Sequence, residues 1–465
     1  MRRERLITAV LVMPFTALPQ TMPPESQFVP PAYKALRFDE NYSCLSNPSN
    51  RTDWLDPIKY IPLRTNAPDW YLTLGGEVRE RFEGNYDPNF GIGGKEANSY
   101  WLQRVTLLSD VHLGERVRIF AEGISGIIEG ENPPAPYVQD DPLDLQFAFL
   151  DVISYLTDDE KLTVRGGRFG MSFGAGRLVA TRAAPNIPSR FDGFEMIYTR
   201  PLWEATTFLT RPVEDDGGIS GSNPNTTFWG LYVTHWLNTR HEQGFDLYYL
   251  GINNQNATYA SGTGHETRHS FGAREFGKWH HWDWDTEQVL QVGSFGNDSI
   301  LAWTAGQNFG YTWDATWQPR LGLKVGVTSG DHNSGDGQLQ TFDALYFKSG
   351  YFNDAGLIRP QNIIGVHPNL TVNPLRNVTM DGGVNWFWRY SRNDAVYAVP
   401  GYIEIPANRN ASAYVATAVD LNLQWRIQRH LTFGASYVHF FTGSYVHEAG
   451  GKDVNYVSTT LTYIF

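Results

Sequence analysis

The chain has 465 residues, one cysteine, 45 glycines and an aromatic content of 14%. Its formal net charge of -12 argues against nucleic-acid binding, and a single cysteine excludes an intrachain disulfide. Beyond the N-terminus no stretch stays apolar over the roughly 20 residues that a membrane-spanning helix needs, which excludes a helical membrane protein. A soluble secreted protein and a membrane β-barrel both remain, because barrel strands carry their lipid face in every second residue.

The N-terminus has the pattern of an export signal. Three arginines within the first five residues precede an apolar segment from Leu6 to Leu18, which is too short to span a membrane. We expect cleavage near Gln20, so residues 1–20 are predicted to be a signal peptide. Residues 21–69 are rich in proline and asparagine and have no sustained period. They are predicted to form a periplasmic N-terminal extension, with part of it in the mouth of the following domain.

From Trp70 onward, apolar residues recur at every second position, which is typical of β-strands with two different faces. Leu321 and Leu323, for example, alternate with Arg320 and Lys324. In each run the charged residues lie in mid-strand, on the side away from the aromatic ones. This arrangement favours a water-filled lumen over a soluble core. The clearest runs are 71–83, 101–113, 117–125, 268–274, 282–292, 320–328, 381–390 and 419–426.

The last strand points to a barrel that closes on itself. Val457, Leu461, Tyr463 and Phe465 share one face, and polar residues share the other. A half-buried strand at the edge of a soluble sheet would show the same alternation. In a membrane barrel, however, the last strand must pair with the first so that no unpaired edge faces lipid.

The connections between the strands alternate between short and long, with one exception at residues 296–298. Short periplasmic turns and long external loops alternate in this way in outer-membrane barrels. The predicted long loops include 172–190 and 253–264. The fold class is therefore predicted to be all-β, a single-chain antiparallel transmembrane β-barrel of about 18 strands over residues 70–465, in the bacterial outer membrane.

One long loop is a candidate constriction of the pore. Residues 172–190 carry Arg177, Arg182 and Arg190 with almost no acidic residue before Asp192. The alternative is an ordinary solvated external loop.

Several segments of the chain form a recognisable combination, and together they resemble the alginate-export family of outer-membrane porins. The resemblance covers the chain from about Arg51 to Phe465. It implies an 18-stranded barrel with an arginine-rich selectivity zone for an anionic polysaccharide. The segments that carry it are Asp69–Phe82, Gly167-Arg168, Gly176–Arg182, Pro185-Asn186, Arg190–Gly193, Gly330-Asp331, Gly335–Gly337 and His367-Pro368.

The resemblance also implies a set of substrate-binding arginines. Relatives usually carry Gly-Arg-Gln-Glu where this chain has Gly167-Arg168-Phe169-Gly170, so the chain departs from the family beside one of these arginines. No cofactor and no metal are expected. Matching motif positions hold Arg79, Arg81, Arg168, Arg177 and Arg182, and Arg104 is the inward arginine of the second strand.

The charges that face the lumen are roughly balanced in the predicted register. Facing arginine and glutamate side chains inside a barrel can simply stabilise its wall. Clustered, unpaired arginines would instead attract carboxylates, which a guanidinium binds in a bidentate manner. The segment 331–337 has residues typical of a calcium loop but lacks the terminal glutamate of an EF-hand, and a plain turn is the alternative. The nucleophile-elbow, P-loop and zinc-protease motifs that would indicate an enzyme do not occur.

The sequence therefore predicts a passive export porin, not an enzyme, that passes an anionic, alginate-like polysaccharide or its fragments. Its expected partners are that polysaccharide, outer-membrane lipid and periplasmic export components. The first alternative is a specific uptake porin for small anionic solutes. The second is a barrel adhesin or enzyme that acts through its external loops.

Overall fold

The computed structural model describes residues 28–92, 97–130, 138–399 and 401–465. The predicted signal peptide lies outside these ranges. None of the helices within them is long and apolar enough to cross a membrane.

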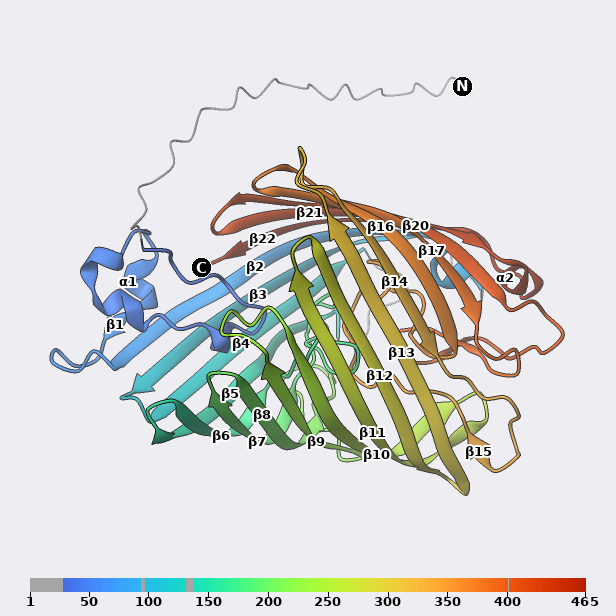
Figure 1. Ribbon diagram of the computed structural model, residues 1–465, viewed down its shortest axis with the longest axis horizontal. Coiled ribbons are helices and arrows are strands. Elements are labelled where there is room, and N and C mark those ends of the chain that lie inside the picture. The colour runs from blue at the N-terminus through green and yellow to red at the C-terminus, as the bar shows by residue number, and fades with distance from the viewer. Residues whose placement is uncertain (1–27, 93–96, 131–137, 400) are drawn as a thin grey trace.

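Eighteen strands, each antiparallel to its neighbours, close into one barrel (Figure 1). The sheet contains two further strands of two residues each, β1 and β15, which pair with β2 and β13. Closure comes from the pairing of the first barrel strand with the last, with Glu77 opposite Ile464 and Tyr86 opposite Asn455. The predicted fold class is confirmed, and no strand edge is left to face lipid.

The barrel strands are β2 (Trp70–Tyr86), β3 (Asn98–Leu113), β4 (Val117–Glu129), β5 (Asp141–Thr157), β6 (Glu160–Phe169), β7 (Phe191–Arg200), β8 (Trp203–Pro212), β9 (Thr226–Trp236), β10 (Gly244–Tyr259), β11 (Gly262–Trp279), β12 (Trp282–Phe295), β13 (Asp298–Thr312), β14 (Arg320–Thr328), β16 (Ile363–Leu375), β17 (Val378–Arg389), β20 (Tyr414–Gln428), β21 (Leu431–Thr442) and β22 (Val454–Ile464). The remaining elements are η1 (Arg37–Asp39), η2 (Ser43–Ser46), η3 (Pro48–Asn50), α1 (Asp56–Lys59), β1 (Ile61–Pro62), η4 (Pro88–Gly91), β15 (Gln338–Leu339), β18 (Val396–Tyr397), β19 (Ile403–Ile405) and α2 (Ser444–Glu448).

The two faces of the wall follow the alternation in the sequence. On β11, Phe271 is 51% exposed on the outside, whereas Arg268 is completely buried on the inside. On β14, Leu321 and Leu323 are exposed and Lys324 points inward, where it contacts Tyr351 of a loop inside the barrel. The apolar face is therefore the lipid face, and the charged face lines the lumen.

One predicted loop is wrong. Residues 253–264 are not a long loop, because β10 continues to Tyr259 and β11 begins at Gly262. Pairs such as Thr258 opposite Thr263 extend the ladder far beyond the apolar part of both strands. The polar composition of this segment resembles a loop, but cross-strand backbone hydrogen bonds form whatever the side chains are.

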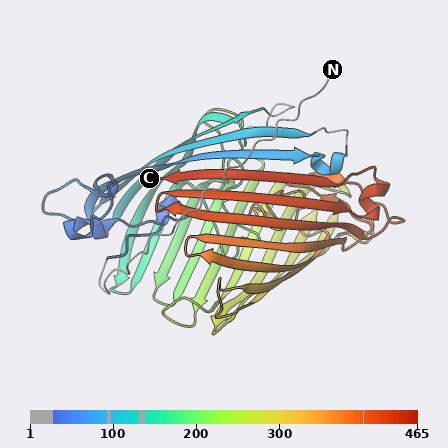
Figure 2. The ribbon, with the colours of Figure 1, turned by 90° about the horizontal axis from the view of Figure 1, so that it is seen from above.

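The N-terminal extension, described from residue 28, packs against the barrel end that carries the C-terminus (Figures 1 and 2). Arg37 donates hydrogen bonds to the carbonyl oxygens of Gly76 (3.0 Å), on the first strand, and Phe465 (3.2 Å), which directly follows the last strand. Asp53 lies 2.7 Å from His430 Nε2, in the turn before β21. The extension therefore bridges the seam at which the barrel closes.

The extension also enters the barrel. The ring of Phe38 packs edge-on against Phe120, Phe147 and Phe149 of β4 and β5, with ring centroids 5.1 to 5.7 Å apart. The short turn at Gly114-Glu115 lies at this end of the lumen. Short turns of such barrels lie on the periplasmic side, so we name this end the periplasmic mouth.

Candidate functional site in the lumen

Two long loops, residues 170–190 and 329–362, fold into the barrel and pair with each other there. Tyr346 donates its backbone N–H to Leu178 O (2.8 Å) and accepts one from Ala180 N (2.9 Å). Lys348 N donates to Gly176 O (2.8 Å). The segment 172–190, the predicted candidate constriction, therefore lies inside the lumen together with a second loop that was not predicted to enter it.

Aromatic contacts hold this pair of loops against the wall. The ring of Tyr346 packs against Phe191 of β7 and Phe228 of β9, with centroids 4.9 and 5.0 Å apart. Phe173 stacks on Tyr232 of β9 at 4.8 Å. The apolar cluster along β4 to β9 thus extends into the lumen. The two loops occupy part of the cross-section of the lumen.

Arg79 and Arg104 bind the tip of loop 170–190. They face each other across β2 and β3. Arg79 donates to the carbonyl oxygen of Ala183 (2.8 Å) and to Asn186 Oδ1 (2.9 Å), with longer bonds to two further carbonyl oxygens. Arg104 forms an ion pair with Glu77 (2.7 Å) and also reaches Ala183 O (3.2 Å). Within the described part of the chain, all acceptors of Arg79 are uncharged, so no direct ion pair there cancels its positive charge.

Arg81 binds the second loop. Its guanidinium lies 2.5 Å from Glu83 on the same strand and 3.0 Å from Asp354 of loop 329–362. Tyr456 of β22 accepts a further hydrogen bond at 2.7 Å. Loop 329–362 starts at β14 and here reaches the first and last strands, so it crosses the lumen.

Arg168 and Arg177 are also paired. Arg168 forms a bidentate pair with Asp192 of β7 (2.7 and 3.0 Å). Arg177 lies 3.0 Å from Glu287 of β12 and donates to the Tyr351 hydroxyl (2.7 Å). Arg168 therefore connects neighbouring strands of the wall, whereas Arg177 connects the wall with both inward loops.

Arg182, like Arg79, has no directly paired carboxylate among the described residues. It lies on loop 170–190 in the left-handed region, with a φ of 51°. Its Nε has no hydrogen-bond partner. Among the residues that the structure describes, no ion pair joins its guanidinium to a carboxylate. Arg182 therefore contributes a positive charge to the lumen that is not directly paired.

The departure from the Gly-Arg-Gln-Glu pattern has a structural reason in this chain. Phe169 is completely buried in the apolar cluster. A Cβ atom on Gly170 would lie 2.7 Å from Leu36 Cδ2 and 3.0 Å from Phe147 Cζ. The small residue leaves room for the N-terminal extension, so the departure is linked to the docking of residues 28–69.

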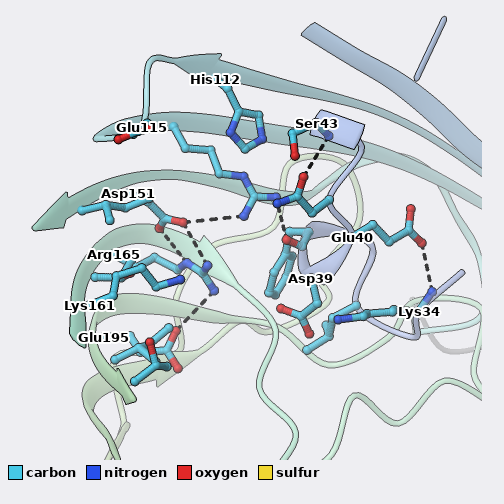
Figure 3. A pocket seen from close by; sticks show the side chains of 18 of the residues that line it. Lys34, Asp39, Glu40, Ser43, His112, Glu115, Asp151, Lys161, Arg165 and Glu195 are labelled. Carbon is cyan, nitrogen blue, oxygen red and sulfur yellow. Dashed lines mark hydrogen bonds and ion pairs between the residues drawn. The ribbon is translucent and has the colours of Figure 1, made fainter. Parts of the chain in front are cut away.

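A cavity of about 880 Å³ lies at the periplasmic mouth, between the extension and strands β3 to β8. Figure 3 shows Asp39 and Ser43 of the extension across the cavity from Asp151 and Arg165 of the wall. Arg165 is paired with Asp151 (2.8 Å) and Glu195 (3.4 Å). Acidic residues outnumber basic ones around this cavity, so the mouth does not itself provide an anion site.

A second cavity, of about 420 Å³, lies on the opposite side of the barrel. Strands β13, β14, β16, β17 and β20 and loop residues 348–354 line it, and we name it the lysine pocket after Lys324 and Lys348. Neither lysine forms an ion pair with a carboxylate among the described residues. The sequence placed Lys324 on the inner face, but it gave no signal for Lys348, which lies in the middle of a long loop.

The segment 331–337 forms a turn, in which the Asp331 side chain accepts from Asn333 N at 3.3 Å. Within the ranges that the structure describes, no group of three or more His, Cys, Asp or Glu side chains is placed to hold a metal ion.

The match to a known family spans nearly the whole barrel. Residues 70–460 match the model of a family described as alginate export. The chain belongs to the alginate-export family. Membership of the family and the closed barrel place the chain in the bacterial outer membrane, as a porin with a function in transport. No individually curated protein matches the chain.

Solved structures of similar fold include a porin and an outer membrane protein. A BenF-like porin from Pseudomonas fluorescens Pf-5 aligns with a TM-score of 0.58 and 7% identity, over 85% of this chain and 98% of that one. The outer membrane protein opdK from Pseudomonas aeruginosa aligns at 0.57 and 11%, over 85% and 98%. OccD3 (OpdP) from the same organism aligns at 0.56 and 11%, over 88% and 93%. At these identities the likeness concerns the fold alone.

Proposed function

We propose that this alginate-export protein passes an anionic polysaccharide of the alginate type, or its fragments, through its arginine-bearing lumen. One observation carries the proposal. Arg182 lies on the loop that occupies part of the lumen, and Arg79 of the wall binds that loop. Among the described residues, no carboxylate forms a direct ion pair with either arginine, so both keep their positive charges. Low-dielectric walls focus such a field and concentrate anions inside a channel. The six predicted arginines, Arg79, Arg81, Arg104, Arg168, Arg177 and Arg182, remain the proposed substrate-binding set.

The roles of these arginines differ in the proposal. Arg81, Arg104, Arg168 and Arg177 each have a carboxylate partner within 3.0 Å, so they act mainly by fixing the inward loops and the wall. Arg79 and Arg182 supply most of the attraction for a passing carboxylate. Contacts of this kind are weak and multiple, which lets a polymer keep moving.

A specific porin for small anionic solutes is the second candidate. It is favoured by the two inward loops, which occupy part of the lumen, and by the cavities of about 880 and 420 Å³ that remain beside the wall. A structure of similar fold, OpdK, has been solved with vanillate. A barrel adhesin or enzyme would act through its external loops and would not need charged residues in the lumen. The arginines inside the barrel therefore do not favour that alternative.

The three parts of the chain have different proposed roles. Residues 1–20 direct export and are removed, and residues 21–69 lie on the periplasmic side, where periplasmic export components are the proposed partners. Residues 70–465 form the channel, which works passively and without a cofactor.

Ion selectivity in planar bilayers tests the proposal. We expect the purified barrel to favour anions over cations and to be blocked more strongly by a polyuronate than by an equal concentration of small carboxylates. Arg182→Gln should weaken both effects, more so at low salt, where screening is least. Arg409→Gln is the matched control, because Arg409 is exposed in the external loop 390–413 and its replacement removes the same single positive charge.

A parent channel without anion preference and without block by the polyuronate would refute the proposal. Block by small carboxylates alone would instead select the second candidate.

A further inference from the structure

The lysine pocket contains buried polar groups whose hydrogen-bonding capacity is not used. Asn353 is 7% exposed, and its Nδ2 donor has no hydrogen-bond partner. Asn308 Oδ1, an acceptor, is buried without a partner as well. Both residues line the same cavity. Buried donors and acceptors are nearly always satisfied in proteins, so a pair that is not satisfied beside one cavity indicates a polar ligand.

Charges of both signs line the pocket, and two of them, Arg320 and Asp354, are already engaged in ion pairs. Lys324 and Lys348 lie on the side formed by β14 and the loop, where the Lys324 ammonium also donates to Tyr351 O and lies 4.2 Å from the centre of the Tyr351 ring. That contact fixes the position of Lys324 and leaves it two further N–H donors. Lys348 is exposed to the lumen. The ammonium groups of Lys324 and Lys348 have no paired carboxylate among the described residues, so together they can bind the carboxylate of a ligand.

The other side of the pocket carries acceptors for hydroxyl groups. Asp381 of β17 accepts one hydrogen bond from Asn422 Nδ2 (2.8 Å) and has no ion pair among the described residues. Asp420 of β20 lies 3.1 Å from His367. Carboxylate oxygens have several lone pairs each, so these side chains retain capacity to accept O–H donors.

We propose that the lysine pocket is a binding subsite for one uronate sugar unit, a ring that carries a carboxylate at one end and hydroxyl groups around it. Lys324, Lys348 and Asn353 bind the carboxylate, and Asn308 and Asp381 accept hydrogen bonds from the hydroxyl groups. The cavity of about 420 Å³ is large enough for one such ring. This assignment rests on the proposed function and names the chemical unit that the lumen recognises.

Calorimetric titration of the full-length barrel in detergent tests the subsite, with glucuronate, glucose and acetate as probes. Glucuronate should bind, and glucose and acetate, which each lack one half of the recognised group, should bind at least about tenfold more weakly. Lys348→Gln should weaken glucuronate binding about tenfold, because one charge-assisted hydrogen bond is lost. Lys348 forms no ion pair that the fold depends on.

Two further variants make the result specific. Asn308→Leu should weaken glucuronate binding and leave acetate binding unchanged. Lys452→Gln, an exposed lysine 3.6 Å from Asp87 in the external region, has the same change of net charge and should bind glucuronate like the parent.

The outcomes separate the two proposals. If the parent channel is anion-selective and blocked by a polyuronate, but Lys348→Gln binds glucuronate like the parent, the subsite is refuted and the proposed function stands. If glucose binds as well as glucuronate, the carboxylate assignment is refuted. If the parent has no anion preference and no polyuronate block, the proposed function itself fails.

Discussion

Replacing Arg79 by alanine should release the tip of the inward loop 170–190. The side chain donates two short hydrogen bonds to that loop, to Ala183 O at 2.8 Å and to Asn186 Oδ1 at 2.9 Å. Hydrogen bonds from a charged donor contribute about 1.5–3 kcal/mol each, so the two together stabilise the docked loop by about 3–6 kcal/mol. Arg104 keeps only bonds of 3.2 Å and longer to the loop. A loss of about 3 kcal/mol raises the population of the detached loop about a hundredfold.

Single-channel recording measures this change. Arg79→Ala should conduct with larger mean conductance and with more open-channel noise than the parent, because the loop detaches more often. Arg79→Lys is the control: it keeps the charge but loses the planar fork, so its anion preference should persist while its noise rises. An Arg79→Ala barrel that folds and shows the same conductance and noise as the parent would refute the role of these hydrogen bonds.

Three further predictions concern the wall and the extension. Leu323→Arg should cost about 2–4 kcal/mol in a lipid-refolding titration, whereas Leu323→Ile should refold like the parent, and equal stability of the two would contradict the assigned lipid face. Burial, together with the charge of nearby Arg37, lowers the pKa of Lys59 from 10.5 to about 7. Between these pH values Lys59 is protonated when the N-terminal extension is undocked and deprotonated when it is docked. Docking of the extension should therefore strengthen as the pH rises from about 7 to about 10.5 and stay constant below that window. Protease cleavage within residues 28–69 should slow accordingly, and Lys59→Met should abolish the trend. Gly170→Val should displace Leu36 and speed the same cleavage at constant pH, and an unchanged rate would show that the close approach does not matter.

The barrel was predictable from the sequence because its rule is local. A strand that faces lipid on one side and water on the other must alternate apolar and polar side chains. Leu323 next to Lys324 is therefore enough to assign the two faces of β14. The same rule failed at residues 253–264, because a ladder that continues beyond the membrane no longer needs an apolar face. The family match confirms the resemblance that the motifs indicated.

The environment of the arginines was not predictable in the same way. Arg79 and Ala183 are 104 residues apart, and the sequence cannot show that a loop folds inward to meet a side chain on the wall. The inward position of Arg81 was visible, but its partner Asp354 was not, because it lies on a loop that crosses the lumen. Lys348 was missed for the same reason. Periodicity places residues on a wall, whereas contacts between loops depend on the complete fold.

The contact of Arg37 with both Gly76 and Phe465 sets an order of events during biogenesis. One acceptor is on the first strand and the other directly follows the last strand, so the contact cannot be complete until the two strands at the seam have met. Until then, residues 28–69 lack part of their binding surface and stay accessible to proteases of the compartment.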